Sequence, residues 1–288
     1  LVVGFIVWRN IERSRTKDTD TANVKIVTSF YPMYIIAENI TDGASNIELV
    51  NMADVNVGCL HDYTLTTEDM KKVENADIFI SNGLGMENFL DKVISTNSSM
   101  QIIDSSKEAE NIVLHVEGVN PHIWTSTETY ITQINSIKDG LQKADNANSE
   151  VYEANANEYI QAIKDLKQKY SEKLQVLKGM KTITLNEAFE YLGQELGMEM
   201  TVIETDHEES TLSAEMLRNL IDKMKEQDIK MIIVAKEDNK TNAETIANET
   251  GARIYELNSG LTGSLDKDAY IKAMEENWKI LLNEEVSN

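Results

Sequence analysis

Histidines at loop positions are the residues of this chain that are best suited to bind a metal. The chain has four histidines, and His61, His122 and His207 each lie in a polar loop between predicted helices and strands. Imidazole is the commonest protein ligand for zinc and related divalent metals. A single loop histidine is usually structural. Three histidines in loops at the carboxyl ends of strands indicate a metal site.

The elements around the first two histidines predict a parallel sheet. Short apolar strands are expected at 24–28, 46–52, 77–81 and 101–104, with helices between them. This alternation implies a mostly parallel sheet with helices on both faces. Ligands of such α/β sheets bind beyond the carboxyl ends of the strands. His61 and His122 are expected at that edge.

The same order of elements returns in the second half, after one long helix. An apolar stripe with helical spacing runs through 149–178. Strands are then expected at 182–185, 199–204, 230–234 and 253–257, with His207 in the loop after the second. The sequence therefore predicts two α/β lobes joined by a long helix. We divide the chain into an N-terminal lobe at 24–147, the connecting helix at 148–179 and a C-terminal lobe at 180–288.

Residues 1–23 are expected to lie outside both lobes. The first eight residues are apolar, too few to cross a bilayer, which takes about 20. We interpret them as the remnant of a signal or anchor helix, followed by a polar linker. A membrane-tethered protein outside the cytoplasm, at the cell surface or in the periplasm, is the expectation. The basic residues Arg9, Arg13 and Arg15 favour the opposite orientation.

The composition and the missing motifs disfavour several classes of function. A net charge of -22 argues against binding to nucleic acid, which needs a basic surface. The single cysteine, Cys59, rules out a disulfide within the chain and a paired-cysteine zinc site. It is two positions from His61, so a ligand role and a buried structural role are both open. The sequence lacks HExxH, GxSxG, Walker and dinucleotide-binding motifs, which disfavours an enzyme. A zinc hydrolase remains the catalytic alternative.

Several segments in combination resemble the TroA-like family, the metal-binding solute-binding proteins of zinc and manganese ABC importers. The resemblance covers about 25–282 and rests on Ser29-Phe30-Tyr31-Pro32, His61-Asp62-Tyr63, Ala76-Asp77, Asn82-Gly83, Glu87 and Asn120-Pro121-His122-Ile123-Trp124. It implies two α/β lobes on one long backbone helix, with the metal in the cleft between them. It also implies a membrane permease as partner, and we expect a monomer.

The resemblance implies four metal ligands. His61 and His122 match the first two. The third position, usually His or Glu, is Asn186, and the fourth, usually Asp, is Asn258. Both replacements are neutral amides, which weaken zinc binding and suit manganese less.

Another side chain can compensate for these neutral amides. The candidates are His207 with Glu208, Glu187, and Cys59. His115, the remaining histidine, is expected to be exposed to solvent.

The expected function is capture of a divalent metal, with Zn²⁺ favoured over Mn²⁺, and delivery of this cargo to an ABC importer. The alternative is a paralogue that keeps the fold but has a weakened or lost metal site. Such a paralogue would act in cell adhesion or bind another ligand.

Overall fold

The computed structural model describes residues 23–55, 57, 60, 63–110, 112–115, 118–203 and 212–284. Almost all of the predicted anchor remnant and linker at 1–23 is therefore outside the described residues. None of the helices in the described part has the length and hydropathy that crossing a bilayer requires.

The first lobe is built on a four-stranded parallel sheet. Its strand order is β2-β1-β3-β4. The strands are β1 (Val24–Thr28), β2 (Ile47–Asn51), β3 (Ile78–Ser81) and β4 (Gln101–Asp104). All four residues of β3 are buried, because this strand lies in the interior of the sheet. A short antiparallel hairpin follows, formed by β5 (Leu114–His115) and β6 (Gly118–Val119).

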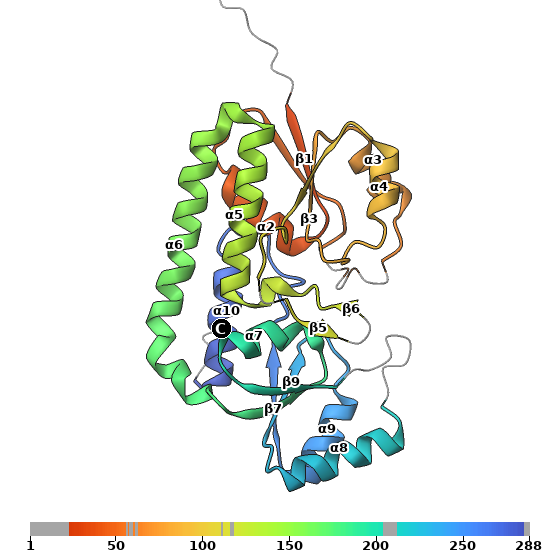
Figure 1. The fold of residues 1–288 in the computed structure, drawn as a ribbon, viewed down its shortest axis with the longest axis vertical. Coiled ribbons are helices and arrows are strands. Elements are labelled where there is room, and N and C mark those ends of the chain that lie inside the picture. Colours follow the sequence, from red (N-terminus) through yellow and green to blue (C-terminus); the bar gives the residue numbers. More distant parts are fainter. Residues whose placement is uncertain are drawn as a thin grey trace, which may run out of the picture.

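Local sequence signals start the helices of this lobe. Pro32 lies in the first turn of α2 (Tyr31–Thr41), where its missing N–H leaves no bond unmade. Thr66 and Asp69 form a capping box that starts α3 (Thr67–Glu74). The remaining helices are α4 (Leu90–Thr96) and α5 (Thr127–Ala144). Figure 1 shows these helices around the sheet.

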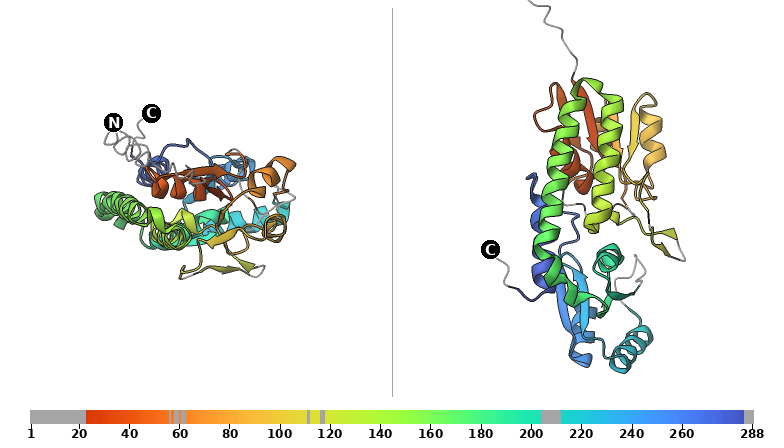
Figure 2. Two further views of the ribbon diagram at one scale, coloured as in Figure 1. Left: turned by 90° about the horizontal axis from the view of Figure 1, so that it is seen from above. Right: turned by 60° about the vertical axis from the view of Figure 1, so that its left-hand side comes forward.

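The long helix α6 (Ser149–Leu174) connects the lobes. It has 26 residues, about 39 Å at 1.5 Å per residue. Its buried stripe includes Tyr152, Tyr159, Ile163 and Tyr170. The helix packs against α5 and α2 of the first lobe and against α10 (Ala269–Leu281) of the second. It therefore runs along both lobes as one continuous helix, as Figure 2 shows.

The second lobe repeats the first in its architecture. Its sheet has the order β10-β9-β7-β8, all parallel. The strands are β7 (Lys181–Thr184), β8 (Glu199–Val202), β9 (Met231–Ala235) and β10 (Arg253–Leu257), and the other helices are α7 (Glu190–Glu195), α8 (Ala214–Glu226) and α9 (Thr241–Thr250). The carboxyl ends of both sheets face the junction between the lobes (Figure 1).

One hydrophobic core continues through both lobes. It runs from Ile26 and Phe79 in the first sheet, through the stripe of α6, to Leu257 and Trp278 in the second lobe. A smaller core lies around Ile232, Val234 and Met224. The predicted fold of two α/β lobes on a long helix is confirmed, whereas the exact lobe boundaries stay a prediction.

Candidate metal centre

His122 is the candidate ligand that the structure describes most fully. It is 3% exposed and precedes the 3₁₀ helix Ile123–Thr125. The Asn120 side-chain oxygen lies 3.0 Å from the His122 backbone nitrogen and 2.9 Å from its Nδ1. Because that oxygen is an acceptor, Nδ1 carries a proton, and in the neutral ring the lone pair is then on Nε2. Such a hydrogen bond fixes the ring of a metal-binding histidine.

Aromatic side chains support the His122 ring from the first lobe. Its centroid lies 5.1 Å from that of Trp124, which in turn meets Phe30 edge to face at 5.2 Å. The Trp124 indole N–H donates to the carbonyl of Ser259 at 2.9 Å. Ser259 follows Asn258 directly. The His122 loop is therefore attached to the second-lobe loop that carries the fourth candidate position.

A second set of hydrogen bonds joins the His122 loop to the segment after β7. The Tyr191 hydroxyl donates to the Asn120 carbonyl at 2.7 Å, and the Asn120 amide donates to the Glu187 carbonyl at 3.0 Å. The Thr125 hydroxyl donates to the Ala188 carbonyl at 2.6 Å. Burial raises the pKa of Tyr191, so its hydroxyl stays a donor near neutral pH. These contacts hold the two halves of the candidate site together.

Glu187 lies between two histidines. Its carboxylate oxygens are 3.6 Å from Nδ1 of His122 and 3.3 Å from Nδ1 of His115. The other ring nitrogen of His115, Nε2, is 2.6 Å from a carboxylate oxygen of Glu190. The expectation of an exposed His115 is therefore wrong. Its side chain is 14% exposed, because the β5–β6 hairpin places it against these two carboxylates.

Asn186, the third candidate position, has both ends of its amide engaged. Its nitrogen donates to the two carboxylate oxygens of Asp238 at 3.2 and 3.0 Å. Its oxygen accepts from the backbone N–H of Ala188 at 3.0 Å, which caps the 3₁₀ helix Glu187–Phe189. The residue thus acts as a helix cap in this structure, a role that asparagine fills well.

Asn258, the fourth candidate position, is also held by local bonds. Its side-chain oxygen accepts from the N–H of Gly260 at 2.8 Å. The side chain of Asn277 bonds both its N–H, at 2.7 Å, and its carbonyl, at 2.8 Å. In both candidate amides, therefore, the oxygen accepts from the N–H two residues ahead. This bond uses one of the two lone pairs of each amide oxygen and leaves the other for a metal.

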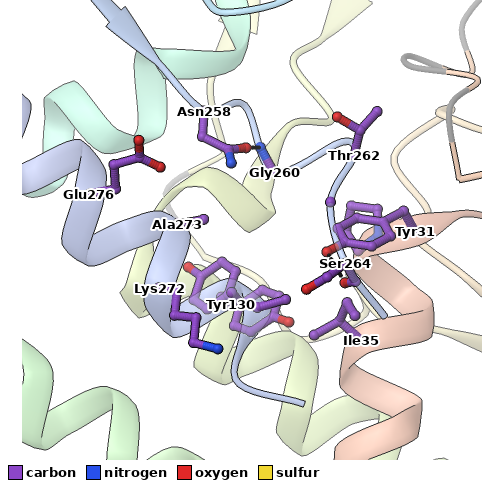
Figure 3. Close-up of a pocket in the computed structure, with 14 residues that line it drawn as sticks. Tyr31, Ile35, Tyr130, Asn258, Gly260, Thr262, Ser264, Lys272, Ala273 and Glu276 are labelled. Carbon is purple, nitrogen blue, oxygen red and sulfur yellow. Dashed lines mark hydrogen bonds between the residues drawn. The ribbon is translucent and has the colours of Figure 1, made fainter. Parts of the chain in front are cut away.

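A cavity of about 180 Å³ lies beside Asn258. Figure 3 shows it between α2, α10 and the loop after β10, with Tyr130 at its base. Its walls include Tyr31, Tyr270 and Gly260, and no histidine of the described chain lines it. The cavity is thus distinct from the contacts around His122.

Three predicted ligands, Cys59, His61 and His207, and also Glu208, lie outside the described residues. Within the described ranges, no group of three His, Cys, Asp or Glu side chains is arranged to hold a metal ion. The structure brings His122 close to Glu187 and attaches its loop to those of Asn186 and Asn258. The roles of Asn120, Tyr191 and Glu190 were not foreseen from the sequence. The only sequence signal was for Asn120, which lies in the Asn120-Pro121-His122-Ile123-Trp124 motif.

Comparison with known proteins identifies the family. The family profile described as ZnuA, zinc-uptake complex component A, periplasmic, matches residues 26–283. The chain belongs to this family.

The proteins that are similar to this chain bind different metals, according to their names. Manganese-binding lipoprotein MntA of Halalkalibacterium halodurans is 28% identical over 268 residues, which cover 90% of this chain and 87% of MntA. Zinc-binding protein AdcA of Streptococcus pyogenes is 26% identical across 98% of this chain, which spans only 59% of AdcA. The solute-binding protein FpvC of Pseudomonas aeruginosa, solved with Mn²⁺, superposes with a TM-score of 0.81 at 26% identity, covering 91% of this chain and 97% of FpvC.

Proposed function

We propose that this protein captures a divalent transition metal outside the cytoplasm and delivers it to the permease of an ABC importer. The proposal rests on the family and on one feature of the site. That feature is the buried His122, whose Nδ1 is engaged by Asn120, an arrangement that leaves the lone pair of the neutral ring on Nε2. A neutral imidazole held in a fixed orientation is a suitable ligand for a divalent transition metal.

The mechanism is capture and release rather than catalysis. His61 and His122 supply two neutral nitrogen ligands from the first lobe. The second lobe completes the shell and signals occupancy to the permease. Because Asn120, Tyr191 and Thr125 bond the two lobes around His122, contacts within the chain hold the halves of the site together. The ordering entropy that binding must offset is correspondingly small.

Zinc is favoured over manganese because the second-lobe positions offer little charge. Asn186 and Asn258 are neutral, whereas manganese prefers carboxylates. Glu187 is the second-lobe carboxylate that reaches His122, at 3.6 Å. We propose that Glu187 or His207 substitutes for the amides at Asn186 and Asn258 when the metal is bound.

The protein is proposed to be a monomer tethered to the membrane at the cell surface or in the periplasm. The periplasmic description of the family and the lipoprotein MntA support this location. The net charge of -22 is consistent with attraction of cations and not of nucleic acid.

Thermal unfolding of the chelator-treated protein, with and without added metal, tests the function. At Zn²⁺ several hundred times its dissociation constant, the free energy of unfolding is expected to rise by about 3–4 kcal/mol. His122→Ala should abolish most of this gain while the chelated protein still unfolds cooperatively. Mn²⁺ should stabilise less than Zn²⁺.

One observation favours the alternative of a paralogue with a lost metal site. The amide oxygens of Asn186 and Asn258 each already accept a hydrogen bond from a local backbone N–H group. A protein of this kind would act in adhesion or bind another ligand. Absence of a thermal shift for every divalent ion tested would support this alternative against metal capture.

A further inference from the structure

The turn between β3 and α4 has an unusual backbone. Gly83, Leu84 and Gly85 have φ angles of +85°, +55° and +83° in succession. A side chain at Gly83 would place its Cβ 2.1 Å from an oxygen of Asp104, and L residues rarely adopt a φ of +85°, so glycine is favoured there. Leu84 adopts a conformation that non-glycine residues rarely take. A turn of this shape needs a strong local anchor.

Glu87 provides that anchor. Its side chain is 5% exposed, and its two carboxylate oxygens accept from the N–H groups of Asn82 at 2.7 Å and Gly83 at 3.1 Å. Successive N–H groups beside a left-handed residue form a small anion-binding concavity. Here the anion is the chain's own carboxylate. Burial raises the pKa of Glu87 to about 7, although both N–H groups act to lower it.

The anchored turn reaches the His122 loop through Asn82. The side-chain nitrogen of Asn82 donates to the Pro121 carbonyl at 2.9 Å. Its side-chain oxygen accepts from the buried Gln133 amide of α5 at 2.9 Å, which fixes the orientation of the Asn82 amide. Pro121 directly precedes His122. A continuous buried path therefore runs from Glu87 through the Asn82 backbone and side chain to the peptide that presents the imidazole.

We propose that Glu87 is a positioning residue for His122, acting through Asn82. Glu87 touches neither His122 nor Glu187 in the described contacts and is not a ligand. Its carboxylate holds the Asn82–Gly83 turn, and Asn82 holds the Pro121 carbonyl at a set place. The consequence for metal affinity rests on the proposed function, whereas the consequence for the His122 ring does not.

A plain stabilising role for Glu87 is the competing explanation, so a matched control is needed. Asp145 is also a buried carboxylate of the first lobe, and it accepts from Asn148 and Tyr152 at 2.7 Å each. It lies at the α5–α6 turn, at the end of the lobe away from the junction with the second lobe (Figure 1). Asp145→Asn should therefore destabilise the fold without moving His122.

The experiment compares Glu87→Gln and Asn82→Ala with Asp145→Asn in the full chain. The first readout is NMR of the metal-free, ¹⁵N-histidine-labelled protein, in which the His122 Nδ1–H signal reports its bond to Asn120. The second is the Zn²⁺ dissociation constant. Glu87→Gln and Asn82→Ala should shift or broaden the Nδ1–H signal and raise the dissociation constant about tenfold or more, as loss of an outer-shell partner does. Asp145→Asn should change only the melting temperature.

The proposal is overturned if both test variants lose stability but keep the wild-type His122 Nδ1–H signal. In that case their Zn²⁺ dissociation constants would also lie within about twofold of the wild-type value. Should Glu87→Gln not fold, Glu87→Asp takes its place under the same criteria, because the shorter side chain cannot hold both N–H groups as Glu87 does. If the wild-type protein binds no Zn²⁺, the proposed function fails, while the NMR signal of His122 still decides whether Glu87 positions the ring.

Discussion

The side-chain nitrogen of Asn186 donates to both carboxylate oxygens of Asp238, at 3.2 and 3.0 Å. Asp238 itself is fixed, because one of its oxygens also accepts from the N–H of Ala235 at 3.1 Å. Asn186 is therefore a well-packed structural residue in this chain, at a position where the resemblance to metal-binding relatives implies a ligand. The weaker metal ligands of the proposed site are therefore those of the second lobe.

Restoring ligands in the second lobe should tighten metal binding. The double variant Asn186→His, Asn258→Asp replaces two neutral amides by an imidazole and a carboxylate, which add donor strength and one negative charge. We expect the Zn²⁺ dissociation constant to fall at least about tenfold in a competition titration with a chelating dye. Loss of the Asn186 cap should lower stability by about 1 kcal/mol.

Asn248→His, at an exposed position of α9, is the control for a histidine added elsewhere. It should leave the affinity unchanged. An unchanged affinity in the double variant would show that the metal does not approach positions 186 and 258.

Glu195 should contribute strongly to the contact between the lobes. Its carboxylate, 2% exposed, accepts from the Ser126 hydroxyl at 2.8 Å and the Thr127 N–H at 2.7 Å. It also meets the Lys167 ammonium at 2.9 Å. Thus a second-lobe carboxylate caps α5 immediately after the His122 loop. Because Lys167 is 37% exposed, we expect Glu195→Gln to lower the free energy of unfolding by about 2 kcal/mol, less than for a fully buried pair.

Denaturant unfolding measures this change. Glu128→Gln removes the other, 68% exposed partner of Lys167 and should change stability by less than about 0.5 kcal/mol. Equal effects of the two substitutions would contradict the structural role assigned to Glu195.

The stability of the protein should depend on pH through Glu87. Burial raises the pKa of its carboxyl from 4.5 to about 7 in the folded state. The folded state therefore holds this proton more tightly than the unfolded state. The resulting stabilisation is complete below about pH 4.5 and is lost as the pH rises through about 7. Relative to Glu87→Gln, the wild-type free energy of unfolding should fall by about 1–3 kcal/mol over this range.

Urea unfolding of both proteins in chelator, from about pH 5 to 8, gives the comparison. Subtracting the Glu87→Gln profile removes the contributions of the histidines. Parallel profiles would mean that Glu87 is ionised throughout this range in the folded protein.

Most of the fold was predictable from the sequence because its elements are locally encoded. The apolar strand 77–81 and the long stripe of α6 are read from periodicity, and the structure has both. The exposure of His115 was predicted wrongly because the environment of this side chain is not locally encoded. Its environment comes from Glu187 and Glu190, more than 70 residues away, and no local pattern encodes such a contact.

The candidate site was only partly predictable. The loop of His122 was located from its motif, but its attachment to the second lobe through Asn120 and Tyr191 depends on tertiary packing. The hydrogen-bonded amides of Asn186 and Asn258 likewise follow from loop geometry that the sequence does not show.

The central claim, that His122 belongs to a metal site, is tested most directly by equilibrium titration of the metal-free protein with Zn²⁺. The account predicts one ion per chain and a dissociation constant at least about 100-fold weaker in His122→Ala. Binding by His122→Ala as tight as by wild type, or no binding by wild type, would contradict it.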